Sequence, residues 1–136
     1  MSRPERRPTR VGLAYGSAAL VGLARGDRRL WALHRAALVR GLIPVTTAGA
    51  VADATRQLHD GEPVDDVLAG VEVEVLDRER AVAVGTVAAA AGTDDLAGAA
   101  LVELASRRNV AAVAERSHRL AEVAAQLGHD LVLHVP

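Results

Sequence analysis

The chain has 136 residues, a length at which one hydrophobic core can support folding without disulfides or bound metals. Half of the residues are hydrophobic, but Phe is absent and only one Tyr and one Trp are present, so we expect a core of Ala, Val and Leu and no aromatic platform for nucleic acid. The 16 basic residues, all Arg, nearly balance 17 acidic ones, and the absence of Cys and Lys excludes disulfides, thiolate nucleophiles, cysteine-bound metals and lysine chemistry.

The first ten residues differ from the rest of the chain. They contain two prolines and four arginines, namely Arg3, Arg6, Arg7 and Arg10. This composition predicts a mobile basic arm over 1–10, which is either a frayed end or an arm that touches phosphate or an acidic partner. The remaining residues, 11–136, are expected to form one domain. Their longest nearly apolar run, 81–92, is shorter than the roughly 20 residues of a membrane span, so we expect a cytoplasmic protein without membrane association.

Short apolar runs alternate with helical patterns in the first half of the chain. The predicted elements are a strand at 11–14, helices at 17–24 and 28–40, a strand at 45–47 and a helix at 48–59. Asp27 is predicted to cap the second helix, and Gly26 and Gly41 to follow helix ends. The core stripe of the second helix is predicted to contain Leu30, Leu33, Ala37 and Leu38.

The second half continues the alternation. The predicted elements are a short helix at 64–69, a strand at 71–75, helices at 78–91 and from 94 to 106, a strand at 110–114, a helix at 118–127 and a strand at 131–135. Val and Glu alternate over 71–75, which is typical of a strand at the edge of a sheet. Asp77 and Ser117 are predicted helix caps, and Leu96, Ala100 and Leu104 the core stripe of the helix that ends at 106.

Strands that alternate with helices predict an α/β fold, a three-layer α/β/α sandwich around a mainly parallel sheet. In such sheets ligands bind outside the carboxyl ends of the strands. The segments in which functional residues are expected are therefore 14–17, 46–53, 93–98 and 114–118.

Four stretches carry a resemblance to a known family: VGLAYGSAAL at 11–20, RGDRRLWALH at 25–34, LAGVEVEVLD at 68–77 and AAGTDDLAGAA at 90–100. Together they resemble the PIN domains, a family best known from VapC-type toxins of bacterial toxin–antitoxin pairs, and the resemblance covers 11–136. It implies a PIN-like fold in which three or four carboxylates hold Mg²⁺ or Mn²⁺, and the metal activates water against an RNA phosphodiester.

The resemblance places the family's acids at five positions. Asp53 stands for the second acid, and Asp95, or Asp94 by a one-residue slip, for the third. The other positions hold Ala14, Gly98 and Arg116 in place of an acid. The degenerate set implies at most a weak metal site at Asp53 and Asp95.

Arg116 is expected to fill the vacant metal position as an internal cation, because a guanidinium there would repel a metal and balance the two remaining acids. Two alternatives remain open. Arg116 could instead point to solvent at the start of a surface helix, or Glu115 could replace the lost acid through a one-residue slip.

Three functions follow from this pattern. The first is a PIN-like domain without catalysis or resident cofactor, acting as a binding or regulatory module for a second copy of itself, an antitoxin-like peptide or uncleaved RNA. The second is an Mg²⁺- or Mn²⁺-dependent endoribonuclease that uses Asp53, Asp94 or Asp95, and Glu115. The third is a site for a small anion, bound by Thr93, Arg116 and Ser17 where helix N-termini converge. Ser17 is otherwise expected to be a helix N-cap.

A dimer interface is also expected from the sequence. The helix predicted at 28–40 presents Trp31 and Leu38 together with Arg28 and Arg35, and Trp and Arg are enriched in interfaces. PIN-like toxins resemble one another in forming homodimers through their early helices, so we expect a symmetric homodimer that buries Trp31. The five histidines show no spacing typical of metal ligands.

Overall fold

The computed structural model describes residues 12–59, 62–129 and 132–135, and the predicted basic arm at 1–10 lies outside the described residues. Its centre is a five-stranded sheet with the strand order β3-β2-β1-β4-β5, in which every neighbouring pair is parallel. The strands are β1 (Leu13–Tyr15), β2 (Val45–Thr47), β3 (Glu72–Glu74), β4 (Ala111–Glu115) and β5 (Val132–Val135). The first strand of the chain is therefore the central one.

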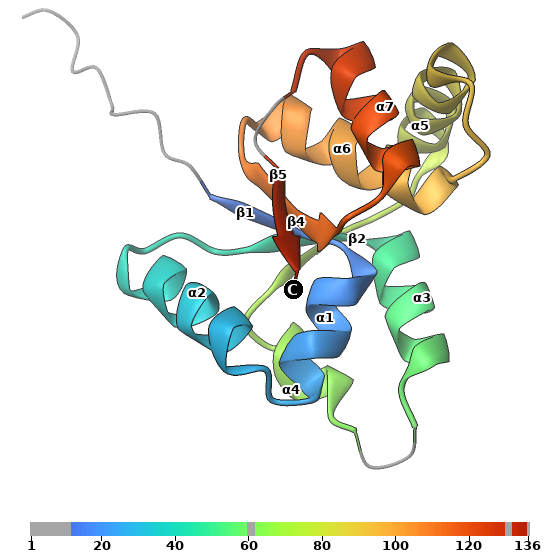
Figure 1. Ribbon diagram of the computed structural model, residues 1–136. Helices are drawn as coiled ribbons and strands as arrows, with labels where there is room; N and C mark the ends of the chain where they lie inside the picture. The colour runs from blue at the N-terminus through green and yellow to red at the C-terminus, as the bar shows by residue number, and fades with distance from the viewer. Residues whose placement is uncertain (1–11, 60–61, 130–131, 136) are drawn as a thin grey trace, which may run out of the picture.

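Helices cover both faces of this sheet. They are α1 (Ser17–Ala24), α2 (Arg28–Val39), α3 (Ala48–Gln57), α4 (Val64–Leu68), α5 (Arg78–Ala91), α6 (Leu96–Arg108) and α7 (His118–Leu127). Figure 1 shows α1 to α4 on one side of the sheet and α5 to α7 on the other. The predicted α/β class, the parallel sheet and the three-layer arrangement are thus confirmed.

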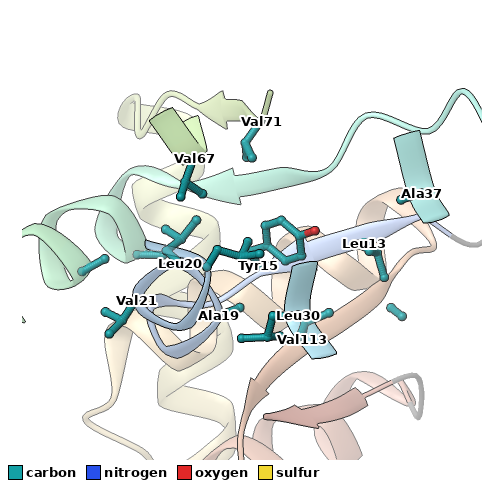
Figure 2. Close-up of a cluster of buried hydrophobic side chains, with 14 residues drawn as sticks. Leu13, Tyr15, Ala19, Leu20, Val21, Leu30, Ala37, Val67, Val71 and Val113 are labelled. Atoms are coloured by element: carbon teal, nitrogen blue, oxygen red, sulfur yellow. The ribbon is translucent and has the colours of Figure 1, made fainter. Parts of the chain in front are cut away.

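The alternation of side chains along β1 divides the core into two clusters. Leu13 and Tyr15 point into the cluster beneath α1 to α4, whereas Ala14 belongs to the cluster beneath α5 to α7. In β4, Val113 belongs to the first cluster and Ala112 to the second, as successive side chains of a strand must. Figure 2 shows Tyr15 in the middle of the first cluster.

β3 lies at the edge of the sheet, as its alternating sequence predicts. β3 pairs on one side only, with β2, where Val73 lies opposite Thr46. Arg107 at the end of α6 reaches Glu74 at 2.5 Å, and Arg108 reaches Glu72 at 2.6 Å. The carboxylates of the edge strand are therefore bound by the C-terminal turn of α6, where positive charge also suits the helix dipole.

Three predicted helix caps are confirmed. The side chain of Asp27 accepts a hydrogen bond from the backbone of Leu30 at 3.0 Å, and Asp77 accepts one from Arg80 at 2.8 Å. Ser117 caps α7 in the same way, through the backbone N–H of Leu120. The glycines at helix ends adopt positive φ angles, a conformation that other residues adopt at a cost; they are Gly26, Gly41, Gly92 and Gly128.

Two predictions about the core are wrong. Leu38 is 43% exposed and His34 is buried in its place on α2, because the buried stripe passes through Leu30, His34 and Ala37. Leu96 is 59% exposed because it is the first residue of α6 and lies beyond the sheet-facing part of that helix. Within the part of the chain that the structure describes, no helix combines the length and apolarity that a membrane crossing requires.

Candidate functional site

A cleft of about 120 Å³ opens at the carboxyl ends of the neighbouring strands β1 and β4. The chain leaves β1 toward α1 on one face of the sheet, and it leaves β4 toward α7 on the other face. The two connections diverge at this point, which is where ligands bind in open parallel sheets. The cleft therefore lies where the sequence predicts a ligand site, at the carboxyl ends of the parallel strands.

Three helices begin at the cleft. Ser17 and Ala18 come from the first turn of α1, Ala97 from that of α6, and Ser117 is the cap of α7. The predicted convergence of helix N-termini is confirmed. Gly16 occupies the N-cap of α1 without a side-chain cap, so the prediction that Ser17 is the cap is wrong: Ser17 is the first helical residue.

Gly16 packs closely at the floor of the cleft. Its N–H donates to the carbonyl of Val113 in β4 at 2.9 Å. A Cβ added there would lie 3.0 Å from the side chain of Leu101, which is tighter than ordinary van der Waals contact, and 3.4 Å from the Val113 carbonyl. Glycine thus lets β1 turn into α1 directly against β4, and this holds the start of α1 over the cleft.

Asp53 lines the cleft from α3 and is held by its own helix. Oδ1 accepts hydrogen bonds from Nη2 and Nε of Arg56 at 2.7 and 3.1 Å, and Oδ2 accepts one from Gln57 at 3.0 Å. The Arg56 guanidinium, and after it a hydrogen bond from the Ser17 hydroxyl, lower the pKa of Asp53 below its ordinary value. Asp53 is therefore ionised, and its charge is already matched by a cation.

Asp95 lines the same cleft from the start of α6. Its Oδ1 accepts a hydrogen bond from the backbone of Gly98 at 2.9 Å, so Asp95 is the N-cap of this helix. A Cβ at Gly98 would collide with the Asp95 carboxylate. Gly98 could carry an acid only if Asp95 gave up its capping position.

Glu115 is the third carboxylate in the lining of the cleft, at the exposed end of β4. The lining residues include Asp53, Asp95 and Glu115 but no Arg or His. The side chains at the cleft are thus acidic, and they oppose the attraction of the helix N-termini for anions.

Arg116 does not fill the cleft. It is exposed, it is absent from the residues that line the cleft, and the prediction of an internal cation is wrong. The reason is the direction of the chain: Glu115 ends β4 and Ser117 caps α7, so the residue between them turns outward.

The position that the resemblance predicts for Ala14, at the metal site, is also wrong. It is completely buried in the cluster beneath α5 to α7 and does not line the cleft. Residues of β1 point alternately to the two faces of the sheet, so only the chain beyond Tyr15 reaches the carboxyl end. An acid at Ala14 would enter an apolar core and would not rebuild a metal site.

Thr93 and Asp94 belong to a different surface hollow of about 580 Å³, beside α7. Thr93 Oγ1 accepts a hydrogen bond from the backbone of Asp95, and Asp94 pairs with Arg119 at 2.8 Å. The anion site predicted from Thr93, Arg116 and Ser17 is therefore wrong as a set, since only Ser17 lines the cleft.

The donor set does not fit the divalent metal that the resemblance implies. Mg²⁺ and Mn²⁺ require several oxygen ligands around one point. Among the described residues no group of three or more His, Asp or Glu side chains comes close enough to hold a metal ion. Asp53, Asp95 and Glu115 share a cleft without forming a coordination shell.

A buried polar cluster beneath α1 to α4 was missed by sequence reasoning. Tyr15 is completely buried and its hydroxyl lies 2.8 Å from Nδ1 of His34, which is 3% exposed. Trp31 packs edge-on against the His34 ring at a centroid distance of 5.4 Å, and its indole N–H donates to the carbonyl of Leu23 at 2.8 Å. The available signal was the position of His34, four residues after Leu30 and three before Ala37 on the apolar stripe.

The four predicted interface residues lie on α2 but differ in environment. Trp31 is partly buried against its own core, whereas Arg28, Arg35 and Leu38 are exposed. Trp31 is thus anchored within the chain.

Comparison with known proteins adds no relative. No protein-family model matches the chain, and no curated protein matches it either.

Proposed function

We propose that this chain is a PIN-like domain that does not cleave RNA and acts as a binding or regulatory module. The resemblance of its sequence to PIN domains and its α/β sandwich support the domain type. The candidate partners are a second copy of the chain, an antitoxin-like peptide or RNA.

The absence of catalysis is supported by one observation about the cleft: its acids do not form a metal shell. Three carboxylates line it, but among the described residues no three such groups gather around one point. Asp53 is bound by Arg56, and Asp95 is used to cap α6. A divalent cation would have to displace both partners and would still lack ligands.

A manganese titration tests the proposal. The wild type is titrated with Mn²⁺ by calorimetry, melted with and without the metal, and incubated with single-stranded RNA. We expect no saturable binding, no rise in melting temperature and intact RNA. A site filled at 100 times its dissociation constant would add ~2.7 kcal/mol to the free energy of unfolding.

Three single variants give the titration its specificity. Asp53→Asn and Asp95→Asn remove the acids of the cleft, and Asp66→Asn removes an exposed acid of α4. Mn²⁺ binding together with RNA cleavage, lost in the first two variants and kept in the third, would establish the alternative, a metal-dependent endoribonuclease.

A further inference from the structure

Helix α2 carries a concentration of positive charge that nothing on the same segment balances. From 28 to 52 the sequence contains four arginines and no acidic residue. The four are Arg28, Arg29, Arg35 and Arg40, and all are exposed. Since the whole chain has a net charge of −1, the rest of the molecule is acidic relative to this helix.

Most other arginines of the described chain are paired. Arg25, Arg56 and Arg80 each have a carboxylate within 3.2 Å, and so do Arg107, Arg108 and Arg119. For the three arginines of α2 and for Arg40, which follows it, no carboxylate of the described residues lies within ion-pair distance. Arg28 and Arg29 are moreover in the first turn, where the helix dipole disfavours positive charge. These two charges therefore do not stabilise α2 itself.

Four exposed residues of α2 follow one face of the helix. Arg28, Ala32, Arg35 and Val39 recur at intervals of four, three and four residues, which places them on one face of a helix, and all four are exposed. Val39 is 87% exposed, and Ile43, just beyond the helix, is 67% exposed. Figure 1 shows α2 at one end of its layer, and the exposure of these side chains leaves them accessible to a partner. We call Arg28, Arg35, Val39 and Ile43 the α2 ridge.

We propose that the α2 ridge docks an acidic, amphipathic segment of a partner polypeptide, with carboxylates on Arg28 and Arg35 and apolar side chains on Val39 and Ile43. The proposal names a partner for the binding module and so rests on the proposed function. Charge complementarity selects an acidic partner, and the adjacent apolar side chains at the end of α2 select a polypeptide.

RNA and a second copy fit the ridge less well. Tyr15 is buried and the Trp31 indole is held by Leu23, so no free aromatic ring accompanies the arginines for base stacking. A two-fold dimer through α2 would place the same positive helix on both sides of the interface, where like charges repel.

Trp31 supplies the readout for a binding test, because it is the only Trp of the chain and lies on α2. The probes are a synthetic helical peptide with Glu at positions i, i+4 and i+7 beside a Leu-rich turn, and the same peptide with Lys in place of Glu. We expect the Glu peptide to change the Trp31 emission in a saturable, salt-sensitive manner and the Lys peptide to have no effect.

Charge variants locate the binding. Arg28→Glu combined with Arg35→Glu is expected to weaken binding of the Glu peptide about tenfold or more. The matched control is Arg78→Glu combined with Arg116→Glu, which reverses two exposed arginines outside α2 that have no carboxylate within ion-pair distance among the described residues. The control is expected to bind within about twofold of the wild type.

Apolar variants complete the test. Val39→Ser with Ile43→Ser is expected to weaken peptide binding severalfold, whereas Val82→Ser, at a 64% exposed position of α5, leaves it unchanged. Equal affinity for the Glu and Lys peptides, or equal effects of the two charge variants, would overturn the proposal.

Two further measurements could also overturn it. One is binding of oligouridylate that depends on Arg28 and Arg35 while the Glu peptide fails to bind. The other is self-association in sedimentation that Val39→Ser with Ile43→Ser abolishes. Neither depends on the metal titration of the cleft, so the failure of one proposal can be told from the failure of the other.

Discussion

The two sides of the sheet are packed with different chemistry. Beneath α5 to α7 the buried cluster consists only of Ala, Val and Leu, as the composition predicts, and half of its fourteen buried residues are Ala. Beneath α1 to α4 the cluster surrounds Tyr15, whose hydroxyl meets the buried His34. The first side is stabilised by close packing of small side chains, whereas the second also depends on a polar pair that must remain hydrogen-bonded.

The largest effect is expected from a charge placed in the aliphatic side. Ala14→Asp puts a carboxylate at a completely buried position, and we expect a loss of about 4 kcal/mol or more in the free energy of unfolding at neutral pH. Burial should raise the pKa of this new acid, so the loss should shrink as the pH falls and the group protonates. Chemical denaturation at about pH 7 and about pH 4.5 measures both effects.

The control for this variant is Ala52→Asp, at an exposed position of α3. We expect it to fold with near wild-type stability. If Ala14→Asp were equally stable, Ala14 would face solvent or the cleft. The assignment of successive β1 side chains to opposite faces of the sheet would then be wrong.

A cavity on the aliphatic side should have the next largest effect. Leu104 is completely buried, and Leu104→Ala is expected to lower the free energy of unfolding by about 2–5 kcal/mol. Leu96→Ala makes the same change on the same helix at a 59% exposed position, with an expected loss below about 0.5 kcal/mol. Similar losses measured by urea denaturation would contradict the observed orientation of α6.

On the polar side, removal of one hydroxyl tests the buried pair. Tyr15→Phe leaves Nδ1 of His34 without its partner and should lower the free energy of unfolding by about 1–3 kcal/mol. Thr86→Val, which removes the exposed hydroxyl bonded to the Val82 carbonyl, is the control with little expected effect. A double-mutant cycle with His34→Leu should show coupling; additive losses would mean that the two groups do not interact.

The smallest effect is expected from titration of His34. Burial lowers its pKa in the folded chain, so the unfolded chain binds more protons as the pH falls through the ordinary histidine range. Stability should therefore be full near pH 8 and decrease toward about pH 5. Melting temperatures of the wild type and of His34→Leu, compared over this range, measure the contribution, and His118→Gln is the control because it changes an exposed imidazole. A wild type whose pH dependence equals that of His34→Leu would show that His34 does not contribute.

Much of the fold follows from local pattern. Asp27, Asp77 and Ser117 cap helices as predicted, and glycine ends them where the periodic pattern stops. The alternating Val and Glu of 71–75 place β3 at the sheet edge. These features depend on neighbours within a few residues, so the sequence is sufficient to predict them.

The candidate site was predicted less well, because it depends on side-chain direction. Asp53 and Asp95 do line the cleft: Asp53 lies on the helix that directly follows β2, and Asp95 caps α6 at its start. Ala14 and Arg116 do not line the cleft, and each lies one residue away from a position that could. Ala14 is one residue before the end of β1, and Arg116 is the single residue between the end of β4 and the Ser117 cap of α7. A one-residue step in a strand reverses the side chain, and sequence spacing alone does not determine where the strand ends.

The sequence by itself determined the class of fold, the order of the elements, most caps and the aliphatic composition of the core, because these properties depend on residue type and local spacing. Only the tertiary structure decided that the acids of the cleft are held by Arg56 and by the start of α6, that Arg116 points outward, and that Tyr15 meets His34. The physical reason is distance along the chain: Tyr15 and His34 are nineteen residues apart, and only the packing of α2 on β1 brings them within hydrogen-bonding distance.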